Sequence, residues 1–156
     1  MKTNEKLVEV LNDLIQINND RIAGYEKAIV SVDASDVSLK ATFRKMADKS
    51  EGYKNTLASA VSSLGGKVAT GTTNSGKIYR TWMDVKNLFT GDDTQSVLDS
   101  CEGGEDAALK AYKEALNSDA GIPSETRQLI NSQFSELKIA HGTIKKFRDQ
   151  HAVVHS

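Results

Sequence analysis

Apolar residues recur every three or four positions in four segments of the 156-residue chain. This spacing places them on one face of an α-helix. The sequence contains one proline and few runs of β-branched or aromatic residues, which also favours helices over strands. We therefore expect an all-α protein with its helices around four segments: residues 7–29, 39–64, 98–115 and 130–148.

Start and stop signals agree with these segments. Asp, Asn, Ser and Thr favour the first position of a helix, and glycine or proline favours its end. The signals are Asp36 before the second segment, Gly65-Gly66 after it, an Asp92/Gln95 capping box before the third, and Gly121 with Pro123 between the third and fourth.

The connections between segments predict the topology. Two of them, around residues 31–35 and 119–123, are short and favour antiparallel neighbours. The connection at 65–93 is long, and its sequence KIYRTWMDVKNLF predicts a short extra helix around Trp82. Such a crossover can return along the bundle, so the second and third helices are expected to be parallel. This gives an up-down-down-up four-helix bundle, one domain at 1–150 with a frayed tail at 151–156.

Charge and cysteine content narrow the classes of function. Acidic and basic residues nearly balance, with a net charge of −1 and a pI of about 6.3, which argues against nucleic acid or an anionic membrane as the partner. The single cysteine, Cys101, excludes an internal disulfide and favours the reducing cytoplasm. The N-terminal residues do not resemble a signal peptide, and no apolar stretch is long enough to cross a bilayer. The amphipathic crossover around Trp82 could cover the bundle or join two copies in a homodimer.

Each predicted helix also carries polar residues on its inner face at about mid-height. Buried polar groups cost free energy unless they are paired. Any one of them is ordinarily a satisfied core residue or a group that reaches solvent, but their occurrence at one level of all four helices predicts a common site. They are Asn18 and Glu26 on the first helix, Ser50 and Tyr53 on the second, Glu105 on the third, and Lys138 and His141 on the fourth.

This arrangement resembles the ferritin-like superfamily, whose members hold two metal ions between four helices. Their ligands are one Glu from each of two helices and a Glu-x-x-His pair from each of the other two. In that resemblance Glu26 in GYEKA and Glu105 in GGEDAALKAY match the single glutamates, and His141 matches one histidine. The remaining ligand positions differ, with Ser50, Tyr53 and Lys138 in place of Glu, His and Glu.

Nearly the whole chain is similar to an uncharacterised bacterial family of about 150 residues that is ferritin-like in fold and distantly rubrerythrin-like. The resemblance rests on LNDLIQINNDRIAGYEKA, RTWMDVKNLFTGDD, CEGGEDAALKAYKEAL and AHGTIKKFRDQH. It implies the fold but no activity, because the family has no assigned function. Loosely related bacterial proteins are associated with stress conditions.

Two hypotheses follow for the site. In the first, Lys138 supplies the positive charge in place of metal and pairs with Glu26 or Glu105, so that the protein is a non-enzymatic bundle without a cofactor. In the second, Glu26, Glu105 and His141 bind one or two divalent ions (iron, zinc or manganese), with storage or oxidase activity as in a ferritin-like oxidoreductase. Glu102, one turn before Glu105, is expected at the bundle edge.

Overall fold

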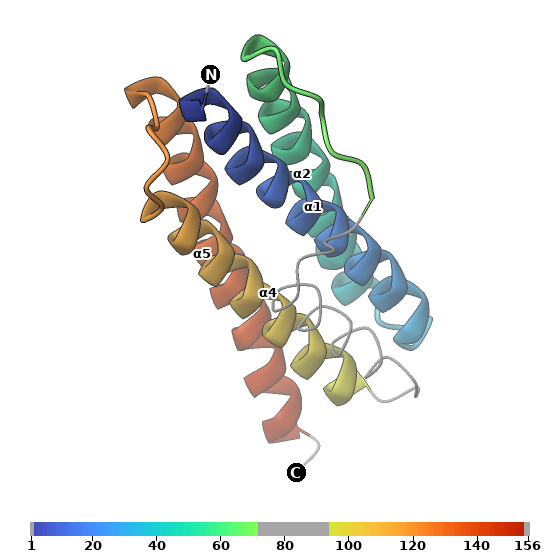
Figure 1. Ribbon diagram of the computed structural model, residues 1–156. Coiled ribbons are helices and arrows are strands. Elements are labelled where there is room, and N and C mark those ends of the chain that lie inside the picture. Colours follow the sequence, from blue (N-terminus) through green and yellow to red (C-terminus); the bar gives the residue numbers. More distant parts are fainter. Residues whose placement is uncertain (1, 72–93, 155–156) are drawn as a thin grey trace.

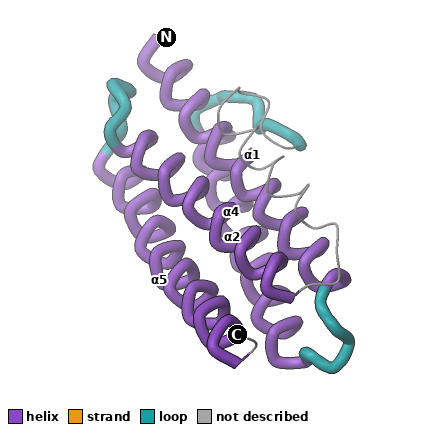
Figure 2. The backbone as a smooth tube through the Cα atoms, turned by 90° about the horizontal axis from the view of Figure 1, so that it is seen from below, coloured by secondary structure: helices purple, strands orange, loops and turns teal. Residues whose placement is uncertain are grey.

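The computed structural model describes residues 2–71 and 94–154 of the chain. This part contains four long helices: α1 (Lys2–Ser31), α2 (Val37–Ser63), α4 (Thr94–Leu116) and α5 (Ser124–Val154). The helices pack side by side, with the short loops 32–36 and 117–123 at opposite ends of the bundle (Figures 1 and 2). In Figure 1, α1 and α5 run downward while α2 and α4 run upward. The predicted all-α bundle and its up-down-down-up topology are thus confirmed.

The sequence makes predictions for the long crossover and for the C-terminal end of the chain. The segment around Trp82, for which the sequence predicts an extra helix, lies outside the described residues. At the C-terminal end, α5 continues to Val154, so residues 151–154 are helical and the expected frayed tail is not observed there. His151 Nδ1 lies 2.7 Å from Gln95 Oε1, a contact that connects the last turns of α5 to the first turns of α4.

The start of α2 differs from the prediction that the Asp36 side chain caps it. Asp36 occupies the N-cap position, but its side chain makes no capping hydrogen bond. The preceding loop is ordered instead by Asp33, whose Oδ1 accepts hydrogen bonds from the backbone and the hydroxyl of Ser35 at 2.9 and 2.8 Å. The predicted Asp92 cap of α4 lies outside the described residues.

Two glycines, Gly65 and Gly66, form the C-terminal cap of α2 as predicted. Gly65 has a φ of 75°, a left-handed conformation that glycine adopts without a steric penalty. Its N–H donates to the Ser62 carbonyl, and the N–H of Gly66 donates to the Val61 carbonyl, which together form a Schellman motif. A Cβ at Gly66 would lie 2.7 Å from the Val8 side chain, so the second glycine lets this loop lie close against α1.

The core lies between the helices, and residues spaced four and three positions apart form the centre of each buried face. The buried faces are wider than this central stripe, since α1 also buries Ile15 and Ile17. None of the described helices combines the length and the hydropathy needed to span a membrane. The central stripe of α1 is Leu7, Leu11, Leu14, Asn18, Arg21, Tyr25 and Ala28, and that of α5 is Ile130, Gln133, Leu137, Ala140 and Ile144.

Candidate functional site

The centre of the bundle contains a buried ion pair between α1 and α4. Arg21 Nε lies 2.6 Å from Glu105 Oε1, and each of the two side chains is only 1% exposed. Arg21 Nη1 also donates a hydrogen bond to the Ser50 hydroxyl on α2. One guanidinium therefore connects three of the four helices, and it lies where a buried charge is costly unless its partner stays in place.

The surroundings of this pair keep the guanidinium charged. Burial by itself lowers the pKa of Arg21, but Glu105, with smaller effects from Tyr25 and Tyr112, outweighs burial and raises it. The guanidinium carbon also lies 5.5 Å from the centre of the Tyr25 ring, within the range of a cation–π contact. Phe43 packs on the same ring, with 5.7 Å between the ring centres. Arg21 is thus a permanent cation held between a carboxylate and an aromatic wall.

A second polar chain crosses the bundle beside the ion pair. Asn18 Nδ2 donates to the Tyr112 hydroxyl at 2.9 Å, and that hydroxyl donates to Gln133 Oε1 at 2.6 Å. Gln133 Nε2 in turn donates to the backbone carbonyl of Tyr53 at 3.3 Å. The chain runs from α1 through α4 and α5 to α2. Both polar clusters therefore fix how the helices sit against one another.

The ionisable hydroxyl and thiol groups of this region stay neutral. Burial, reinforced by Glu105, raises the pKa of the Cys101 thiol, so this cysteine is not an activated nucleophile. The same two causes raise the pKa of Tyr25 far above its ordinary value. Burial also raises the pKa of Tyr112, and burial together with Glu136 raises that of Tyr53, whose hydroxyl donates to Glu136 at 3.1 Å.

These shifts predict how stability depends on alkaline pH. An acid whose pKa is higher in the folded than in the unfolded state stabilises the fold below its unfolded value and loses that contribution as the pH rises. We expect the free energy of unfolding to fall above about pH 10, the ordinary pKa of tyrosine. In absorbance titrations at 295 nm, Tyr25, Tyr53 and Tyr112 should ionise only as the protein unfolds. Ionisation of all four tyrosines near pH 10, with helical circular dichroism intact, would contradict this.

Two of the residues expected on the inner face lie elsewhere. Glu26 is exposed because it follows the buried Tyr25 by one residue, a rotation of about 100° around the helix axis. Lys138 is exposed for the same reason, since Leu137 occupies the inward position, and its Nζ lies 4.3 Å from the centre of the Phe134 ring. Their predicted inner-face placement is wrong. Within residues 4–71 and 94–154, the buried cation is Arg21 and not Lys138.

The other predicted residues divide between two places. Asn18, Ser50 and Glu105 are buried in the central clusters, and Tyr53 joins them through its backbone carbonyl. His141 is only partly buried and belongs to the edge between α4 and α5.

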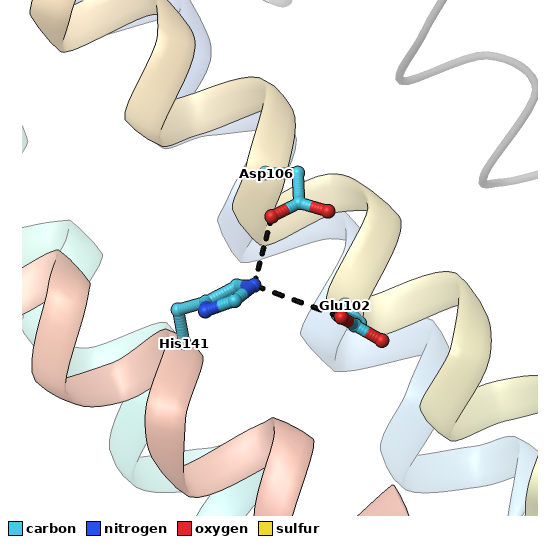
Figure 3. Close-up of side chains that lie close together, drawn as sticks. All are labelled: Glu102, Asp106 and His141. Carbon is cyan, nitrogen blue, oxygen red and sulfur yellow. Dashed lines mark ion pairs between the residues drawn. The ribbon is translucent and has the colours of Figure 1, made fainter.

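At that edge, Glu102 and Asp106 of α4 lie beside the imidazole of His141 on α5 (Figure 3). His141 Nε2 lies 2.8 Å from Asp106 Oδ1 and 3.8 Å from Glu102 Oε1. Arg148 forms an ion pair with the other carboxylate oxygen of Glu102. We call Glu102, Asp106 and His141 the edge cluster. Glu102 lies at the bundle edge as expected, but its contact with His141 was not foreseen.

Three residues of the centre were missed, although the sequence contained a signal for them. Counting steps of four and three from Leu7 reaches Asn18 and then Arg21, whereas a preference for apolar residues selects Ile22. The same counting from Ile130 reaches Gln133 in place of Phe134. Tyr112 lies in the apolar spacing of the third segment, and that spacing gives no partner for its hydroxyl.

The fold is similar to those of two solved bacterial proteins. A mutant of Dps1 from Mycobacterium smegmatis matches with a TM-score of 0.81 and 16% identity over 94% of this chain and 97% of that one. A ferritin-like, diiron-carboxylate protein from Bacillus anthracis str. Ames matches with a TM-score of 0.77 and 16% identity over 95% and 99%. At this identity the likeness concerns the fold alone.

Sequence comparison assigns the chain to a family. No curated protein gives a significant match. A family described as "Domain of unknown function (DUF2383)" matches residues 6–118, well over half of the chain and including both partners of the central ion pair. The chain therefore belongs to this family of unknown function, and its fold is a ferritin-like four-helix bundle.

Proposed function

We propose that this protein is a non-enzymatic ferritin-like bundle, in which the Arg21–Glu105 ion pair takes the central place of a metal pair. The observation that carries the proposal is the 2.6 Å contact between Arg21 Nε and Glu105 Oε1 with both side chains 1% exposed. The carboxylate that would bind a central ion is thus already neutralised from inside the protein. Its role is then to hold four helices in one register, as a structural or interaction module.

The chemistry of the central groups supports this proposal. A pair of divalent ions needs several carboxylates to balance its charge, with imidazoles as further ligands. The side chains that bond to Arg21 or shift its pKa are one carboxylate, Glu105, a serine hydroxyl and two tyrosines. A cation placed 4 Å from the guanidinium would meet a repulsion of about 4 kcal/mol per unit charge at an effective dielectric constant of about 20. This set of groups does not fit a pair of divalent ions.

The competing hypothesis is a metal-dependent storage protein or oxidase with ligands Glu26, Glu105 and His141. The placement of these three residues speaks against it. Glu26 is exposed, Glu105 is buried against Arg21, and His141 contacts Glu102 and Asp106 at the edge. Metal binding at the edge cluster would involve a different set of side chains.

Metal analysis of suitable variants tests the proposal. The protein would be produced without a histidine tag in medium supplied with iron, manganese and zinc, and its metal content measured by mass spectrometry. The matched variants are Arg21→Met/Glu105→Leu, which removes the central pair, and His141→Ala, which alters only the edge. We expect the central double variant to contain the same metal as the wild type. Oxidation of ferrous iron in air should be no faster with the protein than without it.

The opposite result has a distinct signature. Stoichiometric metal that is lost in the folded central double variant and kept in His141→Ala would identify a metal centre in the bundle core and overturn the proposal. Circular dichroism of each variant shows whether the protein is folded.

A further inference from the structure

We propose that the edge cluster of Glu102, Asp106 and His141 binds one divalent cation of the zinc type. Among residues 2–71 and 94–154, it is the one group of three or more His, Cys, Asp or Glu side chains with ligand atoms close enough to share an ion. Those atoms all lie within 4.8 Å of one another. This proposal does not depend on the central ion pair, because the two places share no side chain.

The local sequence explains why these groups converge. Glu102 and Asp106 are four residues apart on α4, so their side chains lie one above the other on the same face of the helix. His141 projects from α5 toward the gap between them (Figure 3). Two neighbouring helices thus supply two carboxylates and one imidazole, a mixture that suits zinc and other borderline divalent ions.

The distances within the edge cluster are compatible with an ion bound between the three groups. Ligands at about 2.0–2.2 Å from a tetrahedral zinc ion lie about 3.4 Å from each other. The two distances from His141 Nε2, 2.8 Å to Asp106 and 3.8 Å to Glu102, lie on either side of that value. Small side-chain rotations would place all three groups at bonding distance from an ion between them. The exposed Asp106 side leaves room for a water molecule as the fourth ligand.

The imidazole nitrogen itself points to a ligand. His141 Nε2 is shielded from solvent, yet it makes no hydrogen bond of acceptable geometry, even though Asp106 is near. A buried polar atom without a directed partner costs free energy. A metal ion in the plane of the ring would use the lone pair of a neutral imidazole and remove this cost.

Arg148 orients the carboxylate of Glu102. It holds the Oε2 atom of Glu102 and leaves Oε1 directed toward His141. Partners of this kind orient the ligands of metal sites and are part of their design. The charge of Arg148 also offsets one of the two carboxylates, so we expect a site of moderate affinity that exchanges its ion, as opposed to a permanent structural centre.

Calorimetric titration of metal-free protein with zinc tests this inference. Untagged protein, dialysed against a chelator and then against buffer, should bind one zinc ion per chain. His141→Ala should weaken binding at least about 10-fold, the cost that even the loss of an outer partner of a ligand carries. The matched control is His151→Ala, which removes a histidine from the same helix outside the cluster and should leave the affinity unchanged.

A spectroscopic measurement identifies the ligands directly. Cobalt bound in place of zinc should give the visible absorption of a four-coordinate ion, and this absorption should be lost in Asp106→Asn and in His141→Ala. Absence of binding to the folded wild type, or equal binding by wild type and His141→Ala, would overturn the inference. Loss of zinc in the central double variant alone would instead contradict the proposed function, so the two failures are distinguishable.

Discussion

Replacing Arg21 with methionine is expected to lower the free energy of unfolding by about 3–5 kcal/mol, because the substitution leaves the Glu105 carboxylate buried without its counter-charge. The two groups are fully enclosed, so water cannot screen the remaining charge. Methionine has a similar length and is apolar, which limits the cavity left behind. Urea denaturation followed by circular dichroism measures the loss.

The double variant Arg21→Met/Glu105→Leu should recover most of this loss. Replacing both partners of a buried ion pair with apolar groups is often neutral or stabilising, because neither charge then has to be removed from water. Ser50, which loses its guanidinium partner, can donate to a carbonyl of its own helix one turn earlier. The single variant Glu105→Leu completes the comparison. If the stability loss of the double variant equals the sum of the losses of the two single variants, the two side chains are not energetically coupled.

A surface ion pair provides the matched control. Lys54 Nζ lies 3.0 Å from Glu51 Oε1 on the outer side of α2, where both side chains reach solvent. Such pairs contribute about 0.2–0.5 kcal/mol, so Lys54→Met should change the stability by no more than this. The contrast isolates burial as the cause of the large effect at Arg21.

Removing the Tyr112 hydroxyl is the second large effect. Tyr112→Phe should destabilise the protein by about 1–3 kcal/mol, since it leaves an N–H of Asn18 and the Oε1 atom of Gln133 without partners in the core. The ring remains, so the change removes one oxygen and almost no packing. Thermal and urea unfolding should agree on the sign and size of the loss.

Tyr53→Phe is the same chemical change in a different setting. Its hydroxyl donates to Glu136, whose side chain is 43% exposed, so water can replace the lost partner. We expect a loss of at most about 1 kcal/mol. Equal losses in the two variants would contradict the role of Tyr112 as the link between α1 and α5.

Much of the fold could be predicted because its causes are local. The helical segments follow from the spacing of apolar residues, and the end of α2 follows from Gly65, whose φ of 75° suits glycine. The parallel course of α2 and α4 follows from the length of the connection between them. Each of these inferences needs only residues that are close in sequence.

The site was predicted less well because its residues had to be assigned one position at a time. Arg21 and Ile22 are adjacent and differ by about 100° around α1, so an apolar preference selected the wrong one. On α5, the predicted inner-face position of Lys138 is wrong in the same way, because the adjacent Leu137 occupies that face. Glu105 and Ser50 were assigned correctly to the inner face, but not their shared partner.

The sequence by itself determined that this protein is an all-helical bundle with a particular topology and with polar groups at mid-height in its core. Only the tertiary structure decided that Arg21 neutralises Glu105 and that His141 faces Glu102 and Asp106. The physical reason is that periodicity is a property of one helix, whereas an ion pair depends on the rotation and spacing of two. Those are set by the packing of the whole bundle, through contacts between residues more than eighty positions apart in the case of Arg21 and Glu105.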